Sequence, residues 1–394
     1  MLTKTFNEAC KIIRKNVLES NKHELIDLEN SLERILFSDY RSKIDSPRTD
    51  LSSMDGAVMH KKEKKRKLLI ANESKAGDPN AKSFKPGECS LIYTGGPIYG
   101  KNKKIIPKEN FIIKDNFIQI LSHPKDDFIR YKASDIHKNK IYLRKRSIIT
   151  LRALALAKSM KINRVKVLQK PKVLVICTGD EIKSDSIIPS TNNIFIKFFV
   201  EYFGGKIINI DFARDNEKEF LKKCNKFNNF DLLITSGGIS RGKYDIVKKS
   251  LIKIGLKILF ERVAIKPGKP TTFGKFSRNK FFLGLPGNPV SCFVSMINFF
   301  PVFINSFSGI QNSNFTTKSF ISKRIIKKNK ELTTFQRVSI KSNYFEVFEN
   351  QDSSLLNTLN ICDGLIIRAP YAKEIRPGEE ANILLFNNLK KEQI

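Results

Sequence analysis

Short apolar runs alternate with helical patterns between residues 172 and 309, and this alternation limits what the chain can fold into more than any other feature. Strands are predicted at 173–176, 206–210, 231–234 and 281–285, and helices at 195–202, 217–227 and 246–254, with one more helix after residue 285. Strands that alternate with helices at this interval pair in parallel, because each helix carries the chain back along the sheet. The sequence therefore predicts an α/β fold with a doubly wound parallel sheet.

The strand predicted at 231–234 runs directly into a glycine-rich turn and then a helix. Gly237, Gly238 and Gly242 allow the backbone to turn tightly and to direct its N–H groups toward an anion, so a phosphate-bearing ligand is expected. Asp245 follows, where a carboxylate could hold a divalent cation on that phosphate. One such turn is more often an ordinary tight connection, so it gains weight only from neighbouring motifs.

Polar groups also follow two other strands of this predicted sheet. Glu181 comes shortly after the strand at 173–176. Pro286 and Gly287 follow the strand at 281–285, and Asn288 is suited to be the N-cap of the next helix. Ligands of parallel sheets bind beyond the carboxyl ends of the strands, so these groups are expected to converge.

Two lysines, Lys266 and Lys269, lie on a loop with the sequence Lys-Pro-Gly-Lys-Pro. Two prolines restrict the backbone of this loop, and the two ammonium groups can act as point charges on phosphate or another oxyanion. Two lysines alone mean little in so lysine-rich a chain. The flanking prolines and glycine are what make this loop a candidate anion site.

The remaining pattern divides the chain into domains. Residues 1–44, together with 141–168, are predicted to form a helical linker domain, and residues 45–140 a β-rich domain inserted into it. Residues 169–312 form the α/β domain, and residues 313–394 a small C-terminal β-barrel. Within the linker domain, apolar spacing predicts two amphipathic helices over residues 6–35 and a third over 147–160, capped by Ser147 or Thr150.

The formal net charge of +32 makes nucleic-acid binding a class to consider, and residues 61–67 are densely basic. Lysine, asparagine, isoleucine and phenylalanine are abundant throughout and tryptophan is absent, which is typical of a genome drifting toward A and T codons. No aromatic residue is interleaved with the basic run, as stacking on bases would require. We therefore predict no nucleic-acid partner.

No membrane or export segment is expected. The most apolar run, 293–307, is interrupted by Asn298, Pro301 and Asn305, and the first residues lack a basic region followed by an apolar core. The six cysteines contain no C-x-x-C pair, so they are predicted to be reduced and buried: Cys10, Cys89, Cys177, Cys224, Cys292 and Cys362. The expected location is the cytoplasm.

Together, these motifs resemble the MoeA family, the molybdopterin molybdenumtransferases of molybdenum-cofactor synthesis, whose eukaryotic relatives include one half of gephyrin. The resemblance covers almost the whole chain. The motifs that carry it are Asp45-Ser-Pro, Ser53-Met-Asp-Gly56, Ala76-Gly77, Thr94-Gly-Gly-Pro97, Gly100, Arg130, Asp135-Ile136, Thr178-Gly-Asp-Glu181, Thr191-Asn192, Arg214-Asp215, Ser236 through Asp245, Lys266 through Pro270 and Leu285 through Pro289.

The resemblance implies a reaction in which adenylylated molybdopterin and molybdate are the substrates, AMP is released and Mg²⁺ is required. It implies that phosphate is held by the glycine-rich turn and by the start of the last α/β helix: Ser236, Gly237, Gly238, Ser240, Gly242, Pro286, Gly287 and Asn288. Lys266 and Lys269 would hold molybdate and neutralise charge as the phosphoanhydride breaks. Arg337 and Ser353 match C-terminal positions associated with molybdate.

The resemblance also implies a set of acidic site residues. Glu181, Asp215 and Asp245 belong to the α/β domain, and Asp245 and Glu181 are the expected Mg²⁺ contacts. Asp55, Thr94 and Asp135 belong to the inserted domain, and in the family the matching positions face the α/β domain of the other subunit. A homodimer with composite sites is therefore expected, and the adenylyltransferase of the same pathway is a further expected partner.

Several positions depart from the family pattern. Leu51, Ala133, Ser134 and Ser190 replace residues of its motifs, and Arg241 and Lys243 place bases within the phosphate turn. The expected acidic site residues are nevertheless retained, which favours an active enzyme. The alternatives are a molybdopterin adenylyltransferase and a non-catalytic, gephyrin-like scaffold. The multidomain layout argues against the adenylyltransferase. The scaffold is disfavoured because two lysines of the loop and four carboxylates are retained together: Asp55, Glu181, Asp215 and Asp245.

Overall fold

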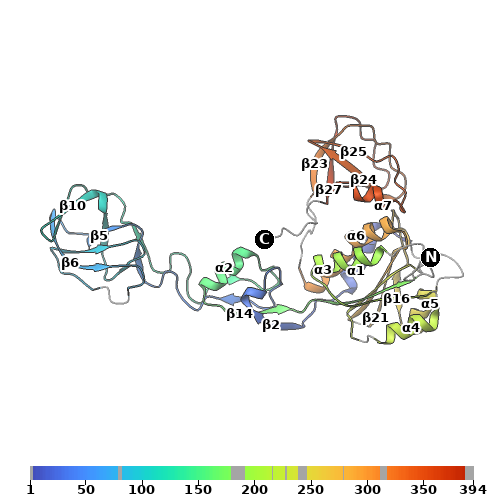
Figure 1. Ribbon diagram of the computed structural model, residues 1–394, viewed down its shortest axis with the longest axis horizontal. Coiled ribbons are helices and arrows are strands. Elements are labelled where there is room, and N and C mark those ends of the chain that lie inside the picture. Colours follow the sequence, from blue (N-terminus) through green and yellow to red (C-terminus); the bar gives the residue numbers. More distant parts are fainter. Residues whose placement is uncertain are drawn as a thin grey trace. The chain divides into compact units, whose positions relative to one another are not determined.

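The computed structural model describes residues 3–78, 82–178, 191–214, 216–226, 229–237, 246–277, 279–310 and 317–386. The chain forms two compact units. The first, here called the major unit, consists of Met1–Lys22 and Leu168–Ile394, and the second, the inserted unit, of His23–Val167. Figure 1 gives the element labels, and each unit is described by itself.

The major unit contains a six-stranded sheet in the order β16-β15-β17-β22-β21-β18. Its strands are β15 (Lys172–Thr178), β16 (Lys206–Ala213), β17 (Leu232–Ser236), β18 (Lys257–Phe260), β21 (Thr272–Ser277) and β22 (Lys280–Leu285). The four strands predicted from the sequence pair in parallel. The doubly wound parallel sheet is thus confirmed. Two further strands, which the sequence pattern did not indicate, extend it: β21 pairs antiparallel with β22, and β18 pairs antiparallel with β21.

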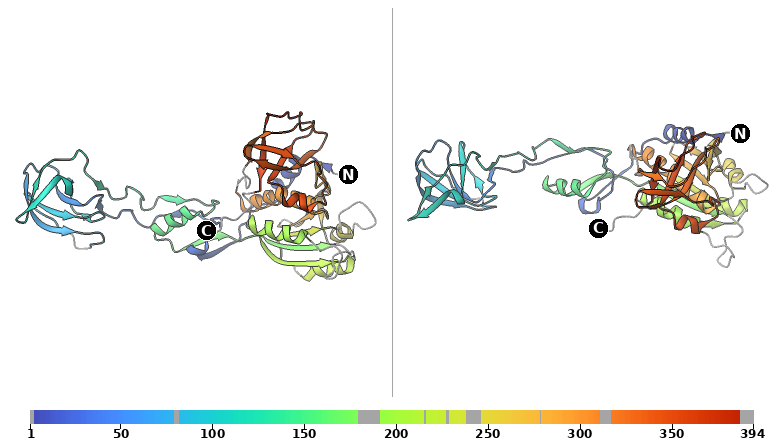
Figure 2. Two further views of the ribbon diagram at one scale, coloured as in Figure 1. Left: turned by 45° about the horizontal axis from the view of Figure 1, so that its top comes forward. Right: turned by 90° about the horizontal axis from the view of Figure 1, so that it is seen from above.

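Helices cover both faces of this sheet, and their bounds agree with the sequence pattern: α3 (Asn192–Tyr202), α4 (Glu217–Lys226), α5 (Ile246–Lys253) and α6 (Pro289–Ser308). One core joins α3, α6 and the N-terminal helix α1 (Phe6–Asn16) to one face, and another joins α4 and α5 to the opposite face. Figure 1 shows α1, α3 and α6 grouped together, and Figure 2 gives two further views. Because both faces are covered, β17 is buried along its whole length.

The C-terminal part of the major unit is a small closed barrel, as expected. Its strands are β23 (Thr317–Ser322), β24 (Thr333–Lys341), β25 (Tyr344–Val347), β26 (Gly364–Arg368) and β27 (Glu380–Leu385), with α7 (Leu356–Asn360) between β25 and β26. Pairing of β24 with β26 closes the ring. A short strand of the α/β part, β20 (Ile265–Lys266), pairs in parallel with β24 and joins the two parts.

The inserted unit is built mainly of short strands. They are β2 (His23–Asp27), β3 (Tyr40–Arg41), β4 (Asp50–Ser52), β5 (Gly56–His60), β6 (Lys67–Ser74), β7 (Glu88–Ile92), β8 (Pro97–Ile98), β9 (Lys103–Pro107), β10 (Phe111–Lys114), β11 (Phe117–Ile120), β12 (Ile129–Arg130), β13 (Ile141–Leu143) and β14 (Arg164–Leu168). Six of them form the sheet β10-β11-β6-β7-β5-β9, which encloses its own apolar core. The helix expected over 147–160 is present as α2 (Leu151–Ser159), and Thr150 is its N-cap.

The prediction of a second N-terminal helix is wrong. Residues 23–27 form β2, which pairs with β14, and Leu28–Asn30 form a single 3₁₀ turn. Leu25 and Leu32, which gave the helical spacing, are exposed at 46% and 37%. The pairing partner of β2 is far away in the sequence, so local periodicity gave no sign of it. The first helix is confirmed, and α1 packs in the core of the major unit.

One helix among the described residues, α6, is long and apolar enough to cross a membrane by length and composition. Most of α6 is buried inside the major unit, where its phenylalanines pack against α1, α3 and the sheet. A helix that is apolar on all sides is typical of the centre of a protein core. All six cysteines are buried and free, as predicted, and burial raises the pKa of the Cys177 thiol to about 12.

Candidate active site

Two turns at the carboxyl edge of the sheet lie against each other. The first turn contains Ser236, the last residue of β17, and Gly237. The second contains Pro286, Gly287 and Asn288, between β22 and α6. We call them the paired turns. A Cβ atom placed on Gly287 would lie 3.8 Å from the Cα of Gly237, so the two backbones are within van der Waals distance. The structure therefore brings together two segments that the sequence had separately suggested as phosphate contacts.

Gly237 has little room for any other residue. Its φ of +88° lies in the left-handed region, and an added Cβ would be 2.2 Å from the carbonyl oxygen of Thr178 at the end of β15. Its N–H donates to the Leu285 carbonyl at 3.3 Å, which ties the turn to β22. A glycine at this position is required because the backbone passes directly over the neighbouring strand end.

Asn288 is the N-cap of α6 and Pro289 the first helical residue, as predicted. The Asn288 side chain does not cap the helix. Its Nδ2 donates to the Ser353 Oγ at 2.9 Å, and the Val290 N–H donates to the Ser353 carbonyl at 3.1 Å. A loop of the C-terminal barrel is thus attached to the helix start, and two predicted site residues, Asn288 and Ser353, are in contact.

Asn192, the first residue of α3, was not predicted as a site residue. Its Nδ2 lies 2.7 Å from the Ser236 Oγ and 2.7 Å from the Gly287 carbonyl oxygen, so it contacts both paired turns. The sequence signal was the pair Thr191-Asn192, a polar pair just ahead of an apolar helix. That pair was read only as part of a family pattern, because nothing local indicates what the amide contacts.

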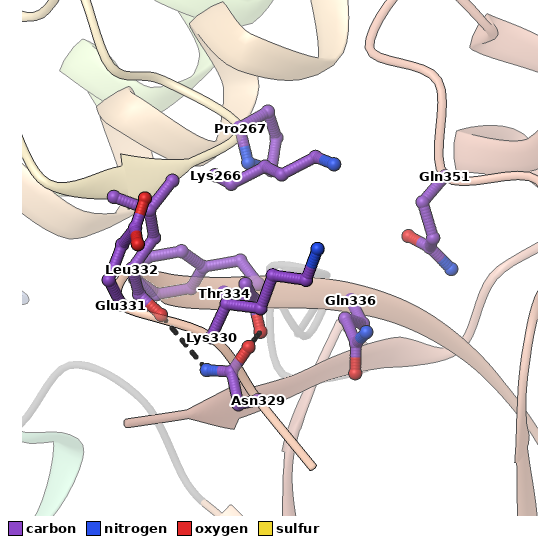
Figure 3. A pocket seen from close by; sticks show the side chains of 10 residues that line it. Lys266, Pro267, Asn329, Lys330, Glu331, Leu332, Thr334, Gln336 and Gln351 are labelled. Carbon is purple, nitrogen blue, oxygen red and sulfur yellow. Dashed lines mark hydrogen bonds between the residues drawn. The ribbon is translucent and has the colours of Figure 1, made fainter. Parts of the chain in front are cut away.

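Lys266 lines a cavity of about 290 Å³ between its own loop and the barrel strand β24. Figure 3 shows the Lys266 and Lys330 side chains extending toward the same space, with Gln351 on the opposite side. We call this cavity the lysine pocket, and its walls are Lys266, Pro267, Asn329, Lys330, Glu331, Leu332, Thr334, Phe335, Gln336 and Gln351. Two ammonium groups around one cavity suit a small oxyanion.

Hydrogen bonds of Asn329 hold the part of the lysine pocket wall that residues 329–334 form. Its Nδ2 donates to the carbonyl oxygens of Leu332 and Ala369 at 2.9 and 2.7 Å, and its Oδ1 accepts from Thr334 Oγ1 at 3.4 Å. The peptide bond between Lys266 and Pro267 is cis. Sequence reasoning missed Lys330, Gln336 and Gln351, because they come from the barrel and reach the pocket only through the pairing of β20 with β24.

The second lysine of the loop has a different position. Lys269 is exposed and is not among the residues that line the lysine pocket. Its carbonyl accepts from the N–H of Val263, which closes the loop. The structure thus separates the two lysines that the sequence had grouped, and a contact between Lys269 and molybdate stays a prediction.

Arg337 on β24 is buried, with 1% of its surface exposed. Its guanidinium donates to the carbonyl oxygens of Leu355, Asn350 and Asp352 at 3.1, 3.3 and 2.9 Å. Burial lowers the pKa of this guanidinium. These bonds fix the loop that carries Ser353 and Gln351, so the contacts that the structure gives Arg337 are structural. A direct contact with molybdate stays a prediction.

In the inserted unit, Asp55 and Thr94 are in contact, as their grouping suggested. The Asp55 Oδ1 accepts from the Thr94 N–H at 2.8 Å and from the Thr94 Oγ1 at 2.9 Å. These two bonds stabilise the ionised form and lower the pKa of the exposed Asp55 carboxyl. Asp135 lies elsewhere in this unit, where its N–H donates to the Ser46 carbonyl at 3.1 Å.

Six predicted site residues lie outside the described residues: Glu181, Asp215, Gly238, Ser240, Gly242 and Asp245. Among the residues that the structure does describe, no three His, Cys, Asp or Glu side chains gather as metal ligands. Glu181 follows β15 by three residues and Asp245 directly precedes α5.

Fold and site define a multidomain α/β protein whose sheet edge presents turns and lysines suited to an anionic ligand. Three family models match the chain: "MoeA N-terminal region (domain I and II)" at residues 4–160, "Probable molybdopterin binding domain" at 174–305 and "MoeA C-terminal region (domain IV)" at 321–386. The solved structure of the molybdopterin biosynthesis MoeA protein of Pyrococcus horikoshii has the same fold. It covers 98% of this chain and 100% of its own, with a TM-score of 0.82 and 22% identity.

Curated relatives agree with these models. The chain is 34% identical to the molybdopterin molybdenumtransferase of Haemophilus influenzae over 283 residues, which are 69% of this chain and 70% of that protein. It is 29% identical to the enzyme of the same name from Nostoc over 304 residues, 73% of this chain and 70% of the relative. The chain therefore belongs to the MoeA family of molybdopterin molybdenumtransferases.

Proposed function

We propose that this protein inserts molybdate into adenylylated molybdopterin and releases AMP, as a step of molybdenum-cofactor biosynthesis. The observation that carries the proposal is the placement of two anion-binding regions in one unit of a MoeA-family chain. The paired turns offer backbone N–H groups and a helix start, and the lysine pocket offers two ammonium groups. Ser353 contacts Asn288 and lies on the same loop as Gln351, so one loop connects both regions.

The paired turns are proposed to bind the diphosphate of the adenylylated substrate. The start of α6 favours negative charge through the helix dipole, and the glycines allow the phosphates to approach the backbone closely. Gly238, Ser240 and Gly242 are proposed to complete this site. The role of these residues is positioning, because phosphoryl transfer is catalysed mainly by orientation and electrostatics.

The lysine pocket is proposed to bind molybdate. A tetrahedral oxyanion needs donors and a compensating positive charge, and the ammonium groups of Lys266 and Lys330 can supply both. Lys269 is proposed to neutralise charge nearby as the phosphoanhydride bond breaks. Hydrolysis of the phosphoanhydride without metal insertion also releases AMP, so only AMP release that depends on molybdate reports the reaction.

Mg²⁺ is proposed as the metal, held by Glu181 and Asp245, with Asp215 as a further acidic site residue. Carboxylate oxygens are the donors that Mg²⁺ prefers, and it is usually shared with substrate phosphates, so the donor type fits. When bound, the ion would neutralise phosphate charge.

A homodimer with composite sites is the third part of the proposal. Asp55, Thr94 and Asp135 would serve the sheet edge of the partner subunit, and the exposed side chains of Asp55 and Thr94 are available for such a role. The adenylyltransferase of the same pathway is proposed as the supplier of the substrate. A cytoplasmic location follows from this pathway.

The test is to incubate the purified protein with adenylylated molybdopterin and Mg²⁺, and to measure AMP with and without molybdate. The proposal expects molybdate-dependent AMP release from the wild type and a large loss in Asp245→Asn and Lys266→Ala. A scaffold would release no AMP. An adenylyltransferase would form the adenylylated pterin from ATP instead of consuming it.

Co-expression of Asp55→Asn and Lys266→Ala subunits tests the composite site. With molybdate well below the wild-type KM, each variant alone should be strongly impaired, whereas mixed dimers contain one site with neither substitution. Activity should therefore return to roughly a quarter of the wild-type value, since half of the dimers are mixed and each has one intact site. No recovery in a confirmed mixed dimer would contradict the composite arrangement.

A further inference from the structure

Asn192 is the only described side chain seen to donate to both paired turns. Its Nδ2 is 2.7 Å from the Ser236 Oγ, at the end of β17, and 2.7 Å from the Gly287 carbonyl, between β22 and α6. Asn192 itself begins α3, so one amide joins three elements of the sheet edge. Sequence alone gave this residue no role.

The orientation of this amide is fixed by the chemistry of its partners. A backbone carbonyl can only accept, so the atom that faces the Gly287 oxygen has to be the Nδ2 donor. The Oδ1 of Asn192 consequently points elsewhere. It is buried and has no hydrogen-bond partner among the described residues. Leaving a buried acceptor without a donor costs stability, which argues that the amide is kept for the contacts of its nitrogen and for its place in the site.

The paired turns have few other direct links. Gly237 and Gly287 carry no side chains. The strands that lead into the turns pair as far as Ser236 and Leu285, and the bond from the Gly237 N–H to the Leu285 carbonyl, at 3.3 Å, is the last backbone contact described there. The Ser236 side chain is buried, so its hydroxyl is not held by solvent. The Asn192 amide therefore adds two short bonds at the point where the strand pairing ends.

We propose that Asn192 is a positioning residue that keeps the two turns at a fixed separation, so that both turns bind one diphosphate together. This inference rests on the proposed function of the paired turns. Asn192 acts through Ser236 and Gly287, and it contacts no reacting atom. Two anion-binding turns that move independently would each hold a phosphate less well, because each would have to be ordered at the moment of binding.

The test compares Asn192→Ala and Asn192→Asp with the wild type, using ADP and Mg²⁺ as the probe in titration calorimetry. Alanine removes both bonds and should weaken ADP binding about tenfold. Aspartate has nearly the same shape, but it cannot donate to the Gly287 carbonyl and it adds a negative charge, so it should weaken ADP binding more. In turnover, the KM for adenylylated molybdopterin should rise while the KM for molybdate stays unchanged.

Asn298→Ala is the matched control. Asn298 lies on α6, and its Nδ2 donates to the Val294 carbonyl at 2.7 Å within the same helix. This substitution should leave ADP binding unchanged. Ser236→Ala removes one of the two Asn192 bonds and should weaken ADP binding less than Asn192→Ala. If Asn192→Ala does not fold, the ADP affinity of Ser236→Ala tests the positioning role in its place.

Unchanged ADP affinity in the Asn192 variants, an equal loss in Asn298→Ala, or a rise in both KM values would overturn the positioning role. Absence of ADP binding to the wild type would overturn it as well. If the wild type binds ADP but releases no AMP with molybdate, the proposed function fails. In that case a loss of ADP affinity confined to the Asn192 and Ser236 variants still supports the positioning role.

Discussion

The paired turns and the lysine pocket are the two proposed anion-binding regions of one unit, and they are built in opposite ways. The paired turns are backbone structures, each formed by a few consecutive residues after a strand. The lysine pocket is made of side chains from the 266–267 loop, residues 329–336 and Gln351, which the pairing of β20 with β24 brings together.

This difference determines how each region responds to change. A backbone site depends on the turn conformation, so one added methyl group in the wrong place can distort it. A side-chain site depends on charge and on the scaffold that holds the side chains, so it can lose a group and keep its shape. The comparison predicts that substitutions in the paired turns affect both folding and binding, whereas substitutions of the pocket lysines affect binding alone.

The largest expected effect is that of Gly237→Ala. The new Cβ would lie 2.2 Å from the Thr178 carbonyl oxygen, in addition to the strain of a φ of +88°. The left-handed conformation alone costs about 1–2 kcal/mol for an alanine, and the contact adds to it. We expect a loss of several kcal/mol in the free energy of unfolding, measured by denaturant titration, and nearly complete loss of AMP release.

Gly204→Ala separates the two causes. Gly204 has the same φ of +88°, but an added Cβ would meet no atom within 4 Å. It should therefore lose about 1–2 kcal/mol from conformation alone and keep its activity. Equal losses in the two variants would show that the contact with Thr178 does not limit the turn.

Arg337→Met should have the next largest effect and tests the scaffold of the pocket. It removes the hydrogen bonds to the carbonyl groups of Asn350, Asp352 and Leu355, so at about 1 kcal/mol per bond we expect a loss of roughly 3 kcal/mol in the free energy of unfolding. The loop that carries Gln351 should loosen, and the KM for molybdate should rise.

Arg368→Met is its counterpart in the same barrel. Arg368 is 4% exposed and donates to the carbonyl groups of Ala372 and Lys373. The Arg368→Met variant should also have a lower free energy of unfolding, but its KM for molybdate should be unchanged. A raised KM in both variants would mean that general softening of the barrel, and not the Arg337 contacts, controls the pocket.

Lys266→Ala should weaken molybdate binding about tenfold, which corresponds to about 1.4 kcal/mol, while the thermal midpoint changes little. The ammonium group faces the pocket and is exposed, so its loss leaves no buried group unpaired. Lys323→Ala serves as the control, since Lys323 lies on the barrel surface and pairs with Glu346 at 2.9 Å. A comparable change in Lys323→Ala would assign the effect to overall charge.

The smallest effect concerns Asp55 and Thr94, where one carboxylate accepts from a backbone and a side-chain donor. Thr94→Val removes the hydroxyl donor and keeps the N–H, so the pKa of Asp55 should rise toward its ordinary value without reaching it. Because that pKa is lowered, the contact is complete above the ordinary aspartate pKa and is lost as the pH falls through the lowered value. An NMR titration of the Asp55 carboxyl measures it, and an unchanged pKa would mean that the hydroxyl contributes nothing.

Much of the fold could be predicted because its signals are local. The parallel strands β15, β16, β17 and β22 and the helices between them follow from unbroken apolar runs and 3.6-residue periodicity, and the cap of α2 follows from Thr150. The exception at residues 23–35 is instructive. This segment has leucines at helical spacing, but its residues 23–27 form a strand that pairs with β14. Because β14 is far away in the sequence, the local pattern could not predict this pairing.

The candidate site divides in the same way. Glycines, prolines and the Asn288 cap identified the paired turns, because a turn is specified by the residues that form it. The residues that complete each region, Asn192 for the turns and Lys330 with Gln351 for the pocket, come from other elements. The sequence also grouped Lys266 with Lys269, and the structure separates them.

By itself, the sequence determined the order of the elements, the conformation of the turns and the supply of positive charge. Only the tertiary structure decided which side chains meet: the Asn192 amide with both turns, the Asn288 amide with Ser353, and the Arg337 guanidinium with the loop behind the pocket. The physical reason is range. Backbone conformation depends on neighbours along the chain, whereas a hydrogen bond between distant residues exists only after the sheet and the barrel have brought them within 3 Å.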